Sequence, residues 1–358
     1  MNDHRILHAE PLTRAIRAIV AAAGSCEREA ELVASNLVEA NLRGHDSHGI
    51  GMVPRYVDAV AEGGLTVDAH VAITQDGGAT LGLDGRHGYG QVIGREAMAL
   101  GIERARRHGV CVVALAHSHH LGRIGHWAEQ CTAEGLVSIH FVNVVARPIV
   151  APFGGRDARF GTNPFCVGVP RPGREPIVLD FATSKIAQGK TRVAYNKGAT
   201  VEPGTLMDSR GEPTVEPRYA VVEPLGALLP FGEHKGSGLA LICELLGGAL
   251  AGGATVRAIG DGRRQVLNSM LSILIDPGRL GGAEHLAAEV ESFIGWYTAS
   301  PPAAGVDRVL VAGEPERLRK AERLANGIAV DPVTWNEIVA AGAKVGVDGA
   351  ELARIAGA

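Results

Sequence analysis

Two groups of histidines, each bounded by glycine, carry the chemistry that this sequence suggests. The first lies in the segment G-H-D-S-H-G over residues 44–49, and the second in H-S-H-H-L-G-R-I-G-H over residues 117–126. Imidazole exchanges a proton near neutral pH because its unperturbed pKa is about 6.5. Glycine lets a ligand approach the backbone closely. The two segments therefore predict an enzyme that transfers protons.

His48 is the strongest candidate for proton transfer in the first segment. Asp46 and Ser47 suit a structural role equally well, because Asp and Ser form caps and turns. A cap has no use for the imidazole of His48, and Gly49 leaves one face of that ring open. Asp180 ends an apolar run and could cap the next element, or its carboxylate could fix the tautomer of a histidine and stabilise its charged form.

A zinc hydrolase is the alternative use of the second segment, through His117, His119, His120 and His126. Three protein ligands and a water make a hydrolytic zinc site. The segment lacks the i, i+4 pair of histidines with a neighbouring glutamate that would favour metal binding, so no metal is expected. His117 and His126 are explained more simply as hydrogen-bonded residues at the ends of elements.

The glycines of residues 88–94, G-Y-G-Q-V-I-G, resemble a dinucleotide-binding fingerprint only in part. The third glycine comes one position late, and the following strand ends at His117 where a Rossmann fold has an acidic residue. The segment therefore predicts a turn that glycine permits, outside a Rossmann fold.

The composition indicates a globular protein with a small-molecule ligand. The chain has 358 residues, of which 46% are hydrophobic and 21% charged, and its formal net charge is −4. Nucleic acid and acidic membranes bind basic surfaces, so neither is an expected partner. Glycine is abundant, with 48 residues, and many of these end apolar runs.

The cysteines and the apolar segments predict a cytoplasmic protein. The five cysteines are odd in number and widely spaced, as free thiols in a reducing compartment are. The first residues lack the apolar core of a signal peptide. The longest apolar stretch, residues 238–254, is interrupted by Glu244 and is shorter than the roughly 20 residues of a membrane span. It is predicted to be a buried helix.

Hydrophobic periodicity predicts helices around an α/β unit. Two helices joined near Gly24 fill the first 43 residues, and a later helix ends at Gly109 before the strand V-C-V-V-A-L-A. A helix over residues 124–134 and the strand L-V-S-I-H-F-V follow, which places the second histidine segment at a strand end, where α/β sheets bind ligands. Residues 151–164 read as a structured loop, and residues 308–311 as a strand.

These elements suggest three regions along the chain. Residues 1–75 form a helical N-terminal part with the His48 segment, and residues 76–310 form an α/β domain for cofactor and substrate. Residues 311–358 form a helical segment that packs back on the first part.

Six motifs together resemble the malate/L-lactate dehydrogenase-like family of NAD(P)-dependent oxidoreductases, whose fold is not a Rossmann fold. The match is nearly full length. The motifs are N-L-R-G-H-D-S-H-G-I-G-M, G-Q-V-I-G-R-E-A-M-A-L-G-I-E, S-H-H-L-G-R-I-G-H-W-A-E-Q-C, V-A-P-F-G-G-R-D-A-R-F-G-T-N-P-F, L-D-F-A-T-S-K-I-A-Q-G-K-T-R-V-A and F-G-E-H-K-G.

The resemblance implies a helical N-terminal part beside a mixed-sheet α/β domain, and a homodimer whose nicotinamide site draws on both subunits. By position, His48 matches the catalytic histidine of the family, Asp180 the aspartate of its strand-end motif, and His120 an active-site histidine of some members. The cofactor, NAD or NADP, is expected to contact the following residues: His48, Gly122, Arg123, Ile124, Val178, Leu179, Asp180, Phe181, Ala182, His234, Asn268, Gly313, Glu314, Pro315 and Glu316.

Met52 departs from the pattern of several relatives. Ureidoglycolate dehydrogenases, for example, have an arginine four residues after the catalytic histidine to hold a substrate carboxylate. In this chain the clamp must come from elsewhere, or the pocket favours a larger apolar side group. Four arginines are candidates for that clamp: Arg55, Arg123, Arg147 and Arg159.

The sequence thus predicts an oxidoreductase that interconverts 2-oxo acids and 2-hydroxy acids by hydride transfer. His48 would donate the proton in reduction, Asp180 would orient and charge His48, and His120 would hydrogen-bond the substrate as a donor aimed at developing charge. The alternatives are a cyclic imine reductase of the piperideine-2-carboxylate type, the zinc hydrolase, and a non-catalytic ligand-binding protein.

Overall fold

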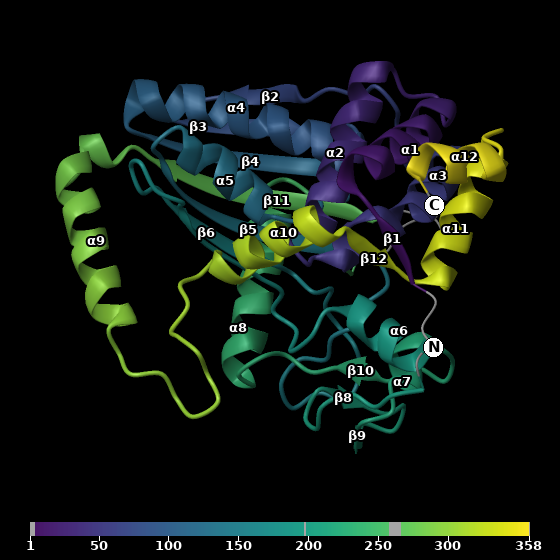
Figure 1. The fold of residues 1–358 in the computed structure, drawn as a ribbon. Coiled ribbons are helices and arrows are strands. Elements are labelled where there is room, and N and C mark those ends of the chain that lie inside the picture. Colours follow the sequence, from purple (N-terminus) through teal and green to yellow (C-terminus); the bar gives the residue numbers. More distant parts are fainter. Residues whose placement is uncertain (1–3, 197, 258–265, 358) are drawn as a thin grey trace.

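A seven-stranded mixed sheet forms the centre of the molecule in this computed structural model, which describes residues 4–196, 198–257 and 266–357. The strand order is β2-β3-β4-β11-β5-β6-β7 (Figure 1). In that order the strands are β2 (Ala72–Asp76), β3 (Thr80–Asp84), β4 (Val110–His119), β11 (Leu267–Ile275), β5 (Val137–Val145), β6 (Phe165–Val169) and β7 (Ile177–Phe181). The pair β3–β4 is parallel and the other pairs are antiparallel. The predicted mixed-sheet α/β class is confirmed.

Strand β11 lies between the two strands of the predicted strand–helix–strand unit. It pairs antiparallel with both β4 and β5, and Asn268 sits opposite Ser118 on one side and Val144 on the other. The end of β4, where the second histidine segment begins, is therefore beside Asn268.

Helices α4 (Gly90–His108) and α5 (Gly125–Ala133) lie side by side over one face of this sheet (Figure 1). Helix α4 ends where predicted, because Gly109 adopts the left-handed conformation with φ +86°. A Cβ atom at Gly94 would lie 2.6 Å from the buried ring of Trp127. This glycine therefore permits the close packing of the two helices.

A separate helical part carries its own apolar core. It contains α1 (Ala9–Ala22), α2 (Glu27–Leu42), α3 (Val53–Ala61), α11 (Pro332–Lys344) and α12 (Gly349–Ala356). Strand β1 (Arg5–Leu7) pairs antiparallel with β12 (Ile328–Val330). Buried side chains from both ends of the chain, such as Ile16 and Trp335, share this core. The two ends of the sequence thus fold as one unit.

The remaining elements lie outside the sheet and the helical part. They are α6 (Gln188–Asn196), β8 (Leu206–Met207), β9 (Pro213–Thr214), α7 (Arg218–Val221), β10 (Ala227–Leu228), α8 (His234–Ile242), a π-helical continuation (Cys243–Leu250), α9 (Ala283–Thr298) and α10 (Glu314–Asn326). Short 3₁₀ turns span Asp46–His48, Ile50–Met52 and Pro277–Arg279. No described helix is long and apolar enough to cross a membrane.

One sequence prediction in this region held in part and one was wrong. The stretch over residues 238–254 is helical to residue 250 but is buried on one face only. Ala240, Cys243 and Glu244 are buried, whereas Leu241, Leu245 and Leu250 are 47%, 45% and 63% exposed. Residues 308–311 form no strand. The neighbouring Ala312 accepts one backbone hydrogen bond from Val178, 3.3 Å long, and no ladder to β7 extends from it.

Candidate active site

His48 ends a 3₁₀ turn that follows helix α2. The turn is fixed by the carboxylate of Asp46, which accepts hydrogen bonds from the Asn41 amide (2.6 Å) and from the guanidinium group of Arg323 (2.6 and 3.0 Å). A Cβ atom at Gly49 would lie 2.1 Å from the Asn41 side chain. The interpretation of Asp46 as a structural residue agrees with these contacts.

The rings of His48 and His120 face each other edge to edge. His48 Nδ1 lies 3.0 Å from His120 Nε2, the rings are parallel to within 8°, and their centroids are 5.2 Å apart. This separation is close to the nitrogen–nitrogen distance plus the two ring radii, so the two nitrogens point along the line between the rings. One hydrogen bond therefore joins the two histidine segments of the sequence.

A buried tyrosine and a buried glutamine continue this contact. The Tyr56 hydroxyl lies 2.7 Å from His120 Nδ1, and Gln91 Nε2 donates to the same hydroxyl at 2.9 Å. Tyr56, Gln91 and His120 are all buried. Tyr56 comes from α3, Gln91 from the first turn of α4, and His48 from its 3₁₀ turn. Three separate elements therefore meet around His120.

Burial keeps both histidines uncharged near neutral pH. It lowers the pKa of His48 to about 4, with a further decrease from His45 and an opposing increase from Asp180. Burial also lowers the pKa of His120 well below its ordinary value, helped by His48. The Asp180 carboxylate thus acts on His48 in the expected direction, but burial has the larger effect.

Asp180 lies at the end of β7 and accepts a hydrogen bond from the backbone N–H of Gly125, 2.7 Å long. Gly125 begins helix α5, so this carboxylate caps a helix distant in sequence instead of the element that follows it. Arg123 is buried and pairs with Glu129. The charges of Glu129 and Asp180 both raise the pKa of Arg123, so this guanidinium group lies near the Asp180 carboxylate. Asp180 therefore influences His48 through charge, without a hydrogen bond between them in the structure.

Two of the expected cofactor segments have glycines where a side chain would not fit. Gly122 has φ +73°, and a Cβ atom there would lie 3.0 Å from the Asn36 amide oxygen, a buried atom without a described hydrogen-bond partner. Gly313 has φ +86° and precedes α10, where a Cβ atom would lie 3.2 Å from the backbone nitrogen of Val178. This places the turn before α10 directly against β7. In both turns the glycine is explained by its positive φ and by close packing within the chain.

Asn268 and His234 occupy different environments. Asn268 is buried, accepts from the backbone N–H of Leu121 (2.8 Å) and donates to the backbone oxygen of Asn143 (2.8 Å). It therefore fixes the residue after His120. His234 begins helix α8, is exposed, and contacts Phe153 with ring centroids 6.0 Å apart.

A family model for malate/L-lactate dehydrogenases matches residues 7–339. The chain belongs to this family. It is 50% identical over 348 residues to hydroxycarboxylate dehydrogenase B of Escherichia coli, covering 97% of this chain and 96% of that protein. It is 40% identical over 311 residues to an L-lactate dehydrogenase of Cupriavidus necator, covering 86% and 89%. The resemblance drawn from the six motifs is confirmed.

A solved Escherichia coli structure of the malate/lactate dehydrogenase type has the same fold. Its TM-score is 0.94 at 48% identity, and 98% of each chain is covered. The sheet and the helical part therefore follow the arrangement of this oxidoreductase family.

The other histidines of the second segment do not gather around His120 as a metal site. His117 points to Asp84 at 3.4 Å, and His126 packs edge-on against Trp127. His119 is buried, and burial lowers its pKa to about 3. In the part of the chain that the structure describes, no three His, Cys, Asp or Glu side chains form a group that could hold a metal ion.

Tyr56 and Gln91 are the site residues that the sequence interpretation missed. Tyr56 lies on the apolar face of α3 with Val53 and Val57, and a buried tyrosine usually needs a partner for its hydroxyl. Gln91 stands within the quoted motif G-Q-V-I-G. The available signal was a polar residue among apolar residues at helical spacing.

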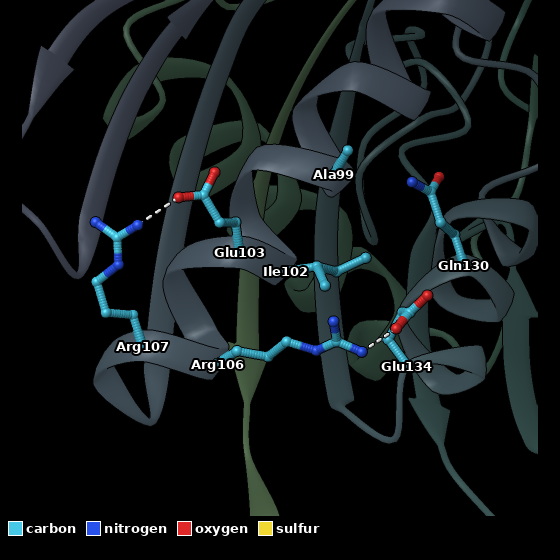
Figure 2. Close-up of a pocket in the computed structure, with 7 residues that line it drawn as sticks. All are labelled: Ala99, Ile102, Glu103, Arg106, Arg107, Gln130 and Glu134. Atoms are coloured by element: carbon cyan, nitrogen blue, oxygen red, sulfur yellow. Dashed lines mark hydrogen bonds and ion pairs between the residues drawn. The ribbon is translucent and has the colours of Figure 1, made fainter.

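The hollow of Figure 2 lies away from this site. It is lined by Ala99, Ile102, Glu103, Arg106, Arg107, Gln130 and Glu134. Glu103 is thirteen positions after Gly90 on α4, which corresponds to roughly 20 Å along the helix. Arg106 pairs with Glu134, and Arg107 pairs with Glu103. The charges of this hollow are therefore satisfied within the chain.

Proposed function

We propose that the chain is a nicotinamide-dependent dehydrogenase that interconverts 2-oxo acids and 2-hydroxy acids. The observation that carries the proposal is the hydrogen-bonded pair of uncharged imidazoles, His48 and His120, beside Asp180 in a member of this family. The nicotinamide of NAD or NADP supplies the hydride when it is bound. The residues of the chain supply the proton, the position of the substrate and the exclusion of water.

His48 hydrogen-bonds the substrate oxygen, and its protonated imidazolium form gives that oxygen a proton in reduction. The neutral ring that results takes the proton back in oxidation. His120 holds Nδ1 of His48, so the other nitrogen, Nε2, is left for the substrate. Asp180 favours the protonated form of His48 during the reaction, because its negative charge raises the pKa of that ring. This division of roles would explain why both histidine segments are present.

The substrate carboxylate requires a cation, and two of the four candidate arginines have other partners. Arg123 is buried against Glu129, and Arg159 pairs with Asp157 on the surface. This leaves Arg55 and Arg147 for the clamp that Met52 does not provide.

Arg55 is the better placed of these two arginines. Desolvation lowers its pKa, and the guanidinium groups of Arg192 and Arg147 lower it further. Glu337, which pairs with Arg192, opposes them, so three cations and one carboxylate lie near one another. The charge of Arg55 also lowers the pKa of His120. We infer that Arg55, supported by Arg147, binds the carboxylate of the 2-oxo acid.

The cofactor contacts are proposed for the turn before α5, the end of β7 and the turn before α10, together with three single residues elsewhere, His48, His234 and Asn268. The proposed residues are His48, Gly122, Arg123, Ile124, Val178, Leu179, Asp180, Phe181, Ala182, His234, Asn268, Gly313, Glu314, Pro315 and Glu316. Gly313 lies against Val178, which supports one continuous surface between two of these segments. The buried Asn268 would act by holding the Leu121 backbone.

A homodimer in a reducing compartment completes the proposal. Helix α9 has no buried residue, and its Phe293, Trp296 and Tyr297 are 61%, 73% and 43% exposed. An apolar helix of this kind needs a cover, and a second copy of the chain would provide one. All five cysteines are described and free, which supports the cytoplasmic assignment. Light scattering of the purified protein tests the dimer.

A substrate panel with NADH and NADPH tests the activity. Reduction of 2-oxo acids that persists after prolonged chelation supports the proposal, and loss of activity that zinc restores would contradict it. Cyclic imines are included, because preference for them would assign the alternative reaction. Arg55→Met should raise KM for the 2-oxo acid, whereas Arg159→Met serves as the matched control with an unchanged KM.

A further inference from the structure

Four side chains form one continuous hydrogen-bonded chain that ends at His48. The contacts run from Gln91 Nε2 to the Tyr56 hydroxyl (2.9 Å), from that hydroxyl to His120 Nδ1 (2.7 Å), and from His120 Nε2 to His48 Nδ1 (3.0 Å). Gln91 and Tyr56 are 2% and 1% exposed. Water therefore does not compete for the inner contacts.

The donor at the start of the chain determines every later donor. The Gln91 amide nitrogen can only donate, so the Tyr56 oxygen accepts from it and the hydroxyl proton is left for His120 Nδ1. A neutral imidazole with Nδ1 as acceptor carries its proton on Nε2. His120 Nε2 then donates to His48 Nδ1, and neutral His48 in turn carries its proton on Nε2.

We propose that Tyr56 and Gln91 are positioning residues that fix the tautomers of His120 and His48, so that His48 presents Nε2–H toward the substrate. This tautomer belongs to the uncharged resting rings and rests on the amide orientation in which Gln91 Nε2 faces Tyr56, whereas the hydrogen bond from Nε2–H to the substrate oxygen rests on the proposed function. Both rings are uncharged at neutral pH, as this requires, because burial lowers the pKa values of His48 and His120.

Tyr89 provides a matched control for Tyr56 within the same core. Both tyrosines are 1% exposed, and their rings pack edge-on with centroids 5.5 Å apart. The Tyr89 hydroxyl takes no part in the contacts to His120 or His48. Replacing either tyrosine by phenylalanine removes one buried hydroxyl at similar packing cost, but only Tyr56→Phe interrupts the chain.

The first measurement is ¹⁵N NMR of histidine-labelled protein without cofactor or substrate, which reports the protonated nitrogen of each neutral ring. In the wild type and in Tyr89→Phe we expect His48 and His120 to be protonated on Nε2. In Tyr56→Phe we expect both rings to lose this preference. A wild-type His48 protonated on Nδ1, or a Tyr56→Phe variant with unchanged tautomers, would overturn the proposal.

The second measurement is the reductive kcat and KM of the same variants. Tyr56→Phe should lower kcat by roughly 10- to 100-fold, less than the removal of a proton donor does, with KM nearly unchanged. Tyr89→Phe should keep kcat within about twofold of the wild type, since it leaves the chain intact. An equal loss in both variants would indicate a packing effect and contradict the proposal.

Gln91→Leu is the second variant if Tyr56→Phe fails to fold. It removes the donor at the start of the chain and leaves Tyr56 in place, so the His120 and His48 tautomers should become mixed. Unchanged tautomers in this variant would refute the role of Gln91. If the wild type shows the expected tautomers but reduces no 2-oxo acid, the proposed function fails while the inference about the tautomers stands.

Discussion

The two ends of helix α4 place polar side chains in opposite environments. At its start, Gln91 is buried and donates to Tyr56, which contacts the uncharged His120. At its end, Arg106 and Arg107 pair with glutamates on the surface, where their side chains are each 58% exposed.

Exposure decides what each arrangement can do. Exposed ion pairs contribute only about 0–1 kcal/mol and leave their charges in water, so they do not alter the chemistry of a neighbour. Buried hydrogen bonds fix donors and acceptors in one orientation, because each unsatisfied group is costly there. The hollow at the end of α4 is wide but solvated, whereas the buried start of α4 orients the reactive ring.

The largest expected effect is at His48. His48→Ala should lower reductive kcat by roughly 100- to 10,000-fold, the range for a lost general acid, while the fold is retained. Steady-state kinetics and circular dichroism check this. Turnover near the wild-type level in a folded variant would return His48 to a structural role.

Gly90→Ala should have the next largest effect, on stability. Its Cβ atom would lie 2.1 Å from the backbone oxygen of His120, so the start of α4 must shift, at a cost of about 1–3 kcal/mol or more. Gly295→Ala in α9 is the control, because its Cβ atom would meet no described atom within 4 Å apart from its chain neighbours and its own helix backbone, and alanine favours helix by about 1 kcal/mol. Chemical denaturation should show a lower free energy of unfolding for Gly90→Ala and a higher one for Gly295→Ala. Equal changes in the two variants would contradict the close contact at His120.

Asp180→Asn should move the pH profile more than the stability. The asparagine oxygen can still accept from Gly125, so the cost should remain below about 1 kcal/mol. The lost negative charge lowers the pKa of His48, whose value is already about 4, so protonation of this ring requires a lower pH. The alkaline limb of reductive activity should therefore move to lower pH, and an unmoved limb with a lower melting temperature would leave Asp180 as a helix cap only.

Arg106→Ala should have the smallest effect. Its exposed ion pair with Glu134 should contribute no more than about 1 kcal/mol, and that contribution should fall in high salt. Urea unfolding at low and high salt, with kcat measured in parallel, checks both points. A large loss of kcat would show that the hollow of Figure 2 takes part in the reaction.

Local patterns predicted most of the fold. The helices on either side of Gly24, the end of α4 at Gly109 and the strand β4 that follows it all agree with periodicity and with glycine at the turns. The position of β11 between β4 and β5 could not be predicted, because pairing between distant strands leaves no local mark. The exposure of α9 and of one face of α8 could not be predicted either, because composition does not show which face of an apolar helix lacks a cover.

Only part of the candidate site could be predicted, because some of its contacts also join residues that are distant in sequence. His48 and His120 stand out by residue type, and the structure places them 3.0 Å apart. Tyr56 and Gln91 resemble ordinary residues of their helices, and their importance depends on a contact across 35 positions in sequence. Burial lowers the pKa of His48 more than Asp180 raises it, and this balance depends on packing that residue types do not reveal.

The contact between Asp46 and Arg323 has a consequence for the newly made protein. The two residues are 277 positions apart in the sequence. Ribosomes add roughly 5–20 residues per second, so the His48 turn waits on the order of tens of seconds for the arginine that fixes it. A truncated product that ends before α10 would lack this contact. The His48 turn therefore gains its full set of contacts only in chains that extend through α10.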